Sequence, residues 1–113
     1  MRARHFNVMT MAAASPALSQ QDLSKLLSVD PTIMVALVDD LERQGLVRRK
    51  RSQSDRRRYV LRLTPAGPQA LEQAFSAIKE AENTLLAPLS AQEADTLKTL
   101  AARLLAPLWP PGA

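Results

Sequence analysis

The chain has 113 residues, a formal net charge of +4 and no cysteine. This length accommodates one modest hydrophobic core, and a composition of 46% hydrophobic and 23% charged residues is typical of a soluble globular protein. Disulfides and thiolate metal sites are excluded, and no apolar run reaches the roughly 18 residues that a membrane span needs. We therefore expect one structural domain in the cytoplasm, with no membrane partner.

Two short helices are predicted near the start of the chain. The first, over residues 2–14, has apolar side chains at helical spacing, namely Phe6, Met9 and Ala13. The second begins after Ser19, a favourable N-cap, and ends near Leu27. His5 is the only histidine and has no second metal ligand nearby in sequence. We expect it to be a surface side chain, or one close to a bound partner, rather than part of a metal site.

A third helix is predicted to begin at Asp30-Pro31, because an Asx cap followed by proline is a strong start signal. It ends at Gln44-Gly45, where glycine suits a left-handed C-terminal residue. Its inward positions are apolar: Met34, Leu37, Val38 and Leu41. The tight link of residues 28–30 joins it to the second helix, and the pair predicts a helix-turn-helix unit.

The most basic segment follows directly, over residues 43–62. It holds nine of the fifteen basic residues and one acid, whereas the sequence on either side of it sums to −2. Alternating runs over residues 47–51 and 59–63 flank a polar tip, which predicts a β-hairpin with an arginine-rich end. Such a concentrated positive surface is typical of proteins that neutralise nucleic-acid phosphates. A solvated basic hairpin without a ligand is the alternative.

Two longer helices are predicted after the hairpin. Thr64-Pro65 caps the first, and Ser90 with Glu93 forms a capping box that opens the second. Each has an apolar stripe; the residues we expect in a two-fold dimer interface are Leu71, Ile78, Leu85, Leu97, Leu100, Leu104 and Leu108. Packing of these leucines within the chain is the alternative.

The order of the elements predicts a winged helix-turn-helix, mainly α with a small β-hairpin wing, in residues 1–64, and dimerisation helices in residues 65–113. Several motifs keep a fixed spacing: Leu41-Glu42-Arg43-Gln44-Gly45-Leu46-Val47, then Asp55-Arg56-Arg57 after seven residues, then Thr64-Pro65-Ala66-Gly67 after six. With these motifs the chain, from about residue 2 to residue 105, resembles the MarR (multiple antibiotic resistance regulator) family. That family normally begins with one more helix, which helps to form the dimer, and this chain starts where the second helix would.

The resemblance implies DNA contacts in the wing. Arg57 matches the arginine that enters the minor groove in the family, where narrow A·T-rich grooves concentrate negative potential. Arg56 and Arg58 are expected to bind phosphate or water, and Asp55 to orient a neighbouring arginine through a charge-assisted hydrogen bond. The other DNA contacts predicted in the hairpin are Arg49, Arg51 and Ser54.

The outward side of the third helix is largely apolar, and we predict DNA contacts from Thr32, Ile33, Val35 and Ala36. Family members usually have small polar residues and an arginine early in this helix. Apolar side chains contact thymine methyl groups but cannot form the bidentate hydrogen bonds that read guanine or adenine. Packing of Ile33 and Val35 on a neighbouring element is the alternative.

The sequence therefore predicts a sequence-specific, double-stranded DNA-binding transcriptional regulator that acts as a homodimer. The resemblance implies a bacterial repressor, in a family that often responds to small aromatic or amphipathic effectors. The alternative is a winged-helix protein-interaction module that has lost operator recognition. An enzyme, a cofactor and a metal site are not expected, since the sequence lacks a phosphate-binding glycine loop, a histidine paired with a nucleophile and a cluster of metal ligands.

Overall fold

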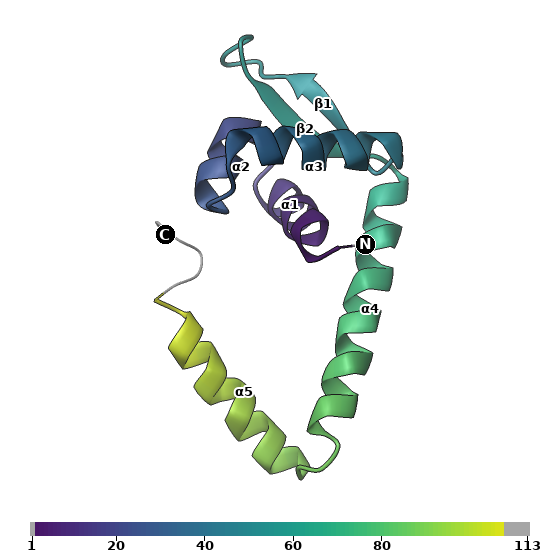
Figure 1. Ribbon diagram of the computed structural model, residues 1–113, viewed down its shortest axis with the longest axis vertical. Coiled ribbons are helices and arrows are strands. Elements are labelled where there is room, and N and C mark those ends of the chain that lie inside the picture. Colours follow the sequence, from purple (N-terminus) through teal and green to yellow (C-terminus); the bar gives the residue numbers. More distant parts are fainter. Residues whose placement is uncertain (1, 108–113) are drawn as a thin grey trace. The chain divides into compact units, whose positions relative to one another are not determined.

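The computed structural model describes residues 2–107, which form five helices and one two-stranded antiparallel sheet (Figure 1). They belong to two compact units, Met1–Ala74 and Phe75–Ala113, which divide within the fourth helix. The elements of the first unit are α1 (Ala3–Ala14), α2 (Gln20–Leu26), α3 (Pro31–Arg43), β1 (Val47–Arg51), β2 (Tyr59–Leu63) and the start of α4 (Ala66–Leu86).

The starts of α2 and α3 follow the capping residues that the sequence predicts. The Ser19 hydroxyl accepts the backbone N–H of Asp22 at 3.1 Å, and the Asp22 carboxylate accepts the N–H of Ser19 at 3.0 Å. Asp30 accepts the backbone N–H of Thr32 at 2.8 Å, with Pro31 at the first helical position. Both caps satisfy N–H groups that have no partner inside the helix.

The turn between α2 and α3 is held in an uncommon backbone conformation. Ser28 has φ 53°, in the left-handed region that few residues other than glycine adopt. Ser24 holds the turn from α2: its carbonyl accepts the N–H of Val29 at 2.9 Å, and its hydroxyl donates to the Val29 carbonyl. At the other end of α3, Gly45 has φ 73°, as its C-terminal position predicts.

One hydrophobic core lies in the first unit, where α1 packs against both α3 and β2 and β1 packs against α3 (Figure 1). Its buried members are Val8, Met9, Ala12, Leu23, Met34, Leu37, Val38, Leu41, Val47 and Leu61. The inward face predicted for α3 is confirmed in full. On α2, Leu23 is buried, and Leu26 and Leu27 are half-buried.

The apolar residues noted at helical spacing in α1 are not all on its buried face. Met9 is buried, but Ala13 is exposed and Phe6 is only half-buried; His5, Val8 and Ala12 are buried with Met9. Helix α1 contacts both α3 and β2. The spacing of apolar residues within α1 does not specify these two partners.

The expectation of a surface histidine is wrong. His5 is 8% exposed, and its Nε2 lies 3.3 Å from Oδ2 of Asp40 on α3. Its Nδ1 is buried and has no hydrogen-bond partner among the described residues.

The hairpin forms as predicted, with Val47 opposite Leu63 and Arg51 opposite Tyr59. An isolated bridge from Ser19 to Val60 ties the start of α2 to β2. Thr64, predicted to cap α4, instead donates its hydroxyl to the carbonyl of Gly45. The start of α4 lies close to β2, since a Cβ at Gly67 would come within 2.8 Å of the Leu63 side chain.

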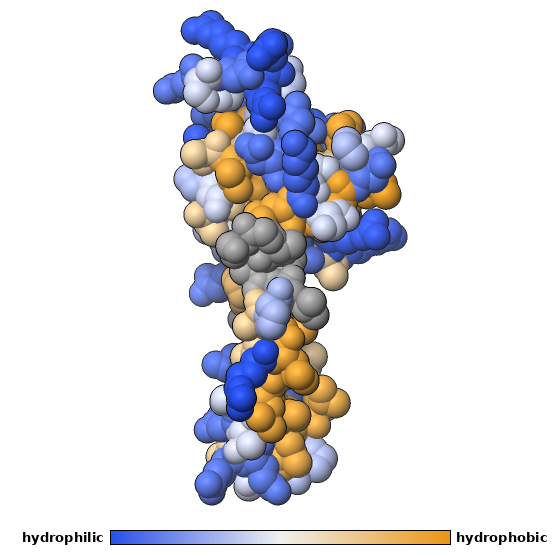
Figure 2. All heavy atoms as spheres, turned by 90° about the vertical axis from the view of Figure 1, so that its left-hand side faces the viewer, coloured by the Kyte–Doolittle hydropathy of each residue, from blue (hydrophilic) through white to orange (hydrophobic). Residues whose placement is uncertain are grey.

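The second unit contains the rest of α4 and α5 (Ala91–Leu105). The predicted capping box is present: Ser90 Oγ accepts the N–H of Glu93 at 3.1 Å, and Glu93 accepts the N–H of Ser90 at 2.9 Å. Lys98 on α5 lies 2.7 Å from Glu82 on α4, and this hydrogen bond raises the pKa of Lys98. No residue from 75 to 107 is buried, and Figure 2 shows hydrophobic side chains as a band along these helices.

Candidate nucleic-acid interface

The tip of the wing presents Arg57 on a turn that Asp55 organises. Asp55 Oδ1 accepts the backbone N–H and the Nε–H of Arg57, both at 3.1 Å, and Oδ2 accepts from Nη2 at 3.3 Å. The guanidinium of Arg57 therefore holds the pKa of Asp55 below its ordinary value. The Arg57 side chain is nonetheless 90% exposed. The hydrogen bonds that an orienting role of Asp55 requires are thus present. They hold Arg57 in place while it faces solvent.

Arg58 connects the wing to the helix-turn-helix. Its guanidinium lies 3.6 Å from Asp55 and 3.6 Å from Asp22 on α2. Asp22 also accepts the backbone N–H of Ser19, and this bond is the main reason that the pKa of Asp22 is lowered. The Arg58 guanidinium is therefore paired with two acids of the first unit, while 46% of its side chain remains exposed.

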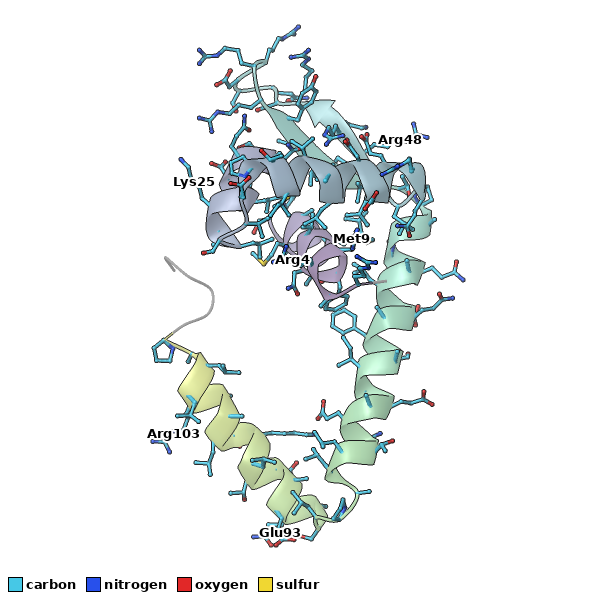
Figure 3. The ribbon with its side chains drawn as sticks, in the orientation of Figure 1. Arg4, Met9, Lys25, Arg48, Glu93 and Arg103 are labelled. Carbon is cyan, nitrogen blue, oxygen red and sulfur yellow. The ribbon has the colours of Figure 1, made fainter. Side chains whose placement is uncertain are left out.

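Among the remaining hairpin residues, Arg51 and Ser54 have partners within the hairpin, and the Arg56 side chain is exposed. Arg51 donates to the carbonyl of Arg56 at 2.7 Å and stacks 4.9 Å from the centre of the Tyr59 ring. Arg56 is exposed, and Ser54 lies 3.0 Å from the hydroxyl of Ser52. Hydrophilic side chains gather at this end of the molecule (Figure 2), and sticks at the tip extend away from the ribbon (Figure 3).

Arg49, one of the predicted DNA contacts, is much less exposed than Arg57 at the wing tip. It is 16% exposed, and all three guanidinium nitrogens bond within the first unit. Nε donates to Gln20 at 2.9 Å, Nη1 donates to Asp39 at 2.8 Å and to Glu42, and Nη2 donates to the Val35 carbonyl at 3.2 Å. These bonds brace β1 against α2 and α3.

The alternation of side chains along β1 could have indicated this inward position of Arg49. Side chains two residues apart on a strand share a face. Val47 is buried, so Arg49 points to the side of β1 that packs on α3, where Asp39 and Glu42 stand. Arg48 and Lys50 alternate to the other side and are exposed; Figure 3 shows Arg48 extending from β1. These two residues, absent from the predicted set, are better placed than Arg49 for phosphate contact.

The outward face of α3 carries the residues that the sequence predicts. Thr32 and Ala36 are exposed, and Ile33 and Val35 are 41% and 43% exposed. Neither of these two larger side chains is buried against a neighbouring element, so both leave apolar surface exposed on α3. The hydrogen bonds of Arg49 to Asp39 and Val35 fix β1 of the wing against this helix.

The predicted dimer residues are placed unequally. Ile78, Leu97 and Leu100 are 49%, 47% and 48% exposed, and Leu85 and Leu104 are both 77% exposed. Leu71 differs from them, because it packs against the core of the first unit. Leu108 lies outside the described residues.

Two classes of site are not found between residues 2 and 107. No group of three or more histidine, aspartate or glutamate side chains is arranged to hold a metal ion there. None of the helices in this range combines the length and the apolar character that crossing a membrane requires.

Residues 2–59 match the model of the MarR family. The chain belongs to this family. Over 99 residues it is 38% identical to a protein of Thauera aromatica that is assigned to transcriptional regulation of the hcr operon, a match that covers 88% of this chain and 60% of that protein. The chain spans about 60% of the length of the curated relatives it matches.

Solved MarR-family structures have the same fold. Wild-type MarR of E. coli is 27% identical, with a TM-score of 0.81 over 93% of this chain and 78% of that one. The PcaV transcriptional regulator of Streptomyces coelicolor, solved with its natural ligand, is also 27% identical, with a TM-score of 0.73 over 94% of this chain and 75% of that one. The predicted family and the predicted winged-helix fold are therefore confirmed.

Proposed function

We propose that this MarR-family chain is a sequence-specific, double-stranded DNA-binding transcriptional regulator without enzymatic activity. The observation that carries the proposal is the wing tip, where Asp55 fixes the backbone and guanidinium of Arg57 while 90% of that side chain faces solvent. A cation that is held in place and still exposed suits insertion into a narrow minor groove. The helix-turn-helix beside it supplies a helix of the length that a major groove accepts.

Readout by α3 is proposed to rest on shape and thymine methyl groups. Ile33, Val35 and Ala36 offer apolar surface, and Thr32 adds one hydroxyl near the start of the helix. A methyl group on the base distinguishes thymine in the major groove, and apolar side chains can recognise it. The proposed contacts on the wing are Arg48, Lys50, Arg51, Ser54, Asp55, Arg56, Arg57 and Arg58.

Homodimerisation is part of the proposal, since DNA-binding winged helices commonly use two-fold related half-sites. It is supported by the exposed leucines of α4 and α5, which leave an apolar stripe of the kind that marks a partner surface. Repression in the cytoplasm and a small aromatic or amphipathic effector remain predictions. The natural ligand in the PcaV structure, whose fold this chain shares, supports the effector.

A second candidate function follows from the same helix. The early part of α3 carries apolar residues and no base, a composition that also suits a protein-interaction surface. In that case the chain would be a winged-helix interaction module, and the basic wing would be a solvated surface.

Selection of duplexes from a random pool tests the proposal and separates the two candidates. A DNA-binding regulator should enrich duplexes with two related half-sites and A·T-rich segments where the wings lie. Arg57→Ala is the matched variant for the wing, with Lys79→Ala on the exposed side of α4 as the control. Recovery of an unenriched pool by the native chain would contradict the proposed function and favour the interaction module.

A further inference from the structure

Helix α3, the recognition helix proposed to enter the major groove, carries a net negative charge, as does the DNA it would bind. Between Pro31 and Arg43 it has three acids, Asp39, Asp40 and Glu42, and one base. Asp39 lies seven residues after Thr32 and three after Ala36, so it shares the outward face of α3 with these two exposed residues. Its side chain is 52% exposed. A bare carboxylate there would repel the phosphates that flank a major groove.

The same structure provides a cation for these acids. Arg49 Nη1 lies 2.8 Å from Asp39 and also bonds Glu42, while the backbone N–H of Arg49 donates to the second Glu42 oxygen at 3.1 Å. Asp40 has its own partners, Arg43 and the ring of His5. All three acids of α3 are therefore paired with a basic side chain.

The geometry of Arg49 favours this internal role over a phosphate contact. The side chain is 16% exposed, against 90% for Arg57 at the wing tip. Its remaining bonds, to Gln20 at 2.9 Å and to the Val35 carbonyl at 3.2 Å, fix the guanidinium plane between α2 and α3. A guanidinium with bonds from every nitrogen would have to break several of them to reach DNA.

We infer that Arg49 is a positioning residue that masks Asp39 and Glu42, and so lets an acidic recognition helix enter a DNA groove. This inference rests on the proposed DNA-binding function. Arg49 acts through the two carboxylates and touches no base or phosphate. Its removal should therefore weaken binding by exposing charge on α3 rather than by removing a contact to DNA.

A mutant cycle tests the inference with the tightest duplex recovered from the random pool. The variants of this 113-residue chain are Arg49→Met, Asp39→Asn/Glu42→Gln, and the triple variant that combines them. Lys79→Met, which removes one positive charge from the exposed side of α4, is the control. At about 50 mM salt, Arg49→Met should bind on the order of tenfold more weakly than the native chain and than the control.

Neutral acids should abolish that loss. The triple variant should bind within about threefold of Asp39→Asn/Glu42→Gln, because the charges that Arg49 masks are then absent. If Arg49 contacted phosphate, the triple variant would still lose about tenfold, and the inference would be wrong. This comparison holds even if Arg49→Met alone does not fold, since neither member of the pair leaves an unpaired carboxylate.

Salt separates masking from a purely structural brace. The loss in Arg49→Met should shrink between about 50 mM and about 200 mM salt, because ions screen the repulsion. A loss that is equal at both salt concentrations, or no loss at all, would overturn the inference while leaving native DNA binding intact. A native chain that binds no duplex would overturn the proposed function as well.

Discussion

The two units of the chain use their apolar residues in opposite ways. In the first unit, side chains from α1, α2, α3 and both strands meet in one core, and eight of them are less than 2% exposed. In the second, no residue from 75 to 107 is buried, although α4 and α5 are as clearly amphipathic. The first unit thus buries its apolar stripes within the chain. The second unit leaves its leucines exposed, and Leu85 and Leu104 are each 77% exposed.

The contrast separates folding from assembly. A stripe that is buried within the chain stabilises the fold at any protein concentration. A stripe that is covered by a second chain contributes only when that chain is bound, so its contribution depends on concentration. We therefore expect substitutions in the first unit to change unfolding directly, and substitutions in the second unit to change it through the dimer.

The largest expected effect comes from charging the open stripe. Leu100→Glu/Leu104→Glu should convert a dimer at micromolar concentration into a monomer, because buried carboxylates without partners are costly. A monomer presents one wing, so affinity for a two-fold duplex should fall by about 100-fold or more. Light scattering gives the mass, and titration with duplex gives the affinity.

A native chain that is already monomeric would contradict this prediction. Glu substitution at two exposed polar positions of the same helix that lie off the stripe, Gln92 and Thr99, provides the matched control and should leave the mass unchanged.

The next effect compares one leucine from each unit. Leu41→Ala removes a fully buried side chain from the core and should lower the free energy of unfolding by about 2–5 kcal/mol, whatever the protein concentration. Leu104→Ala should have an effect that shrinks on dilution. Urea unfolding at two protein concentrations measures both. Equal, concentration-independent losses would remove the distinction between the units.

A smaller effect is expected at the wing tip. Arg57→Ala should weaken duplex binding by about 1–3 kcal/mol and reduce the preference for A·T-rich flanks, since a guanidinium in the minor groove contributes both charge and fit. Titration at fixed salt measures it beside Lys79→Ala. Losses of the same size in both variants would argue against groove insertion.

The smallest effect concerns the cap of α2. The Ser19 N–H and hydroxyl lower the pKa of Asp22 in the folded chain. The cap should therefore stabilise the fold fully above the unfolded pKa of about 3.9, and lose its effect as pH falls through the lower folded value. Unfolding followed at several acidic pH values should show a smaller pH slope for Asp22→Asn than for the native chain.

Local signals in the sequence predict most of the fold. Ser19, Asp30 and Ser90 cap the helices as their side-chain chemistry requires, and the alternation of residues 47–51 gives the hairpin. The inward face of α3 follows from spacing, because its four buried apolar residues recur at three- and four-residue intervals. These features depend on residues that are close together in the sequence.

The features that the sequence did not predict depend on contacts between residues that are far apart in the chain. His5 is buried because α1 lies between α3 and β2, a placement that no spacing within residues 2–14 records. Alternation along β1 places Arg49 on the same face as Val47, but only the structure shows that its partners there are Gln20 and Asp39. Leu71 shares a stripe with Ile78 but packs on the core, because the start of α4 belongs to the first unit.

The salt dependence of duplex binding tests the central claim most directly. If the basic wing neutralises phosphates in a dimer, on the order of 6–10 contacts form, and affinity for the selected duplex should fall by about 10³–10⁵ between about 50 mM and about 200 mM salt. Competition titration in this range gives the slope. An affinity that does not change across the range would contradict a nucleic-acid interface and identify the wing as a solvated surface.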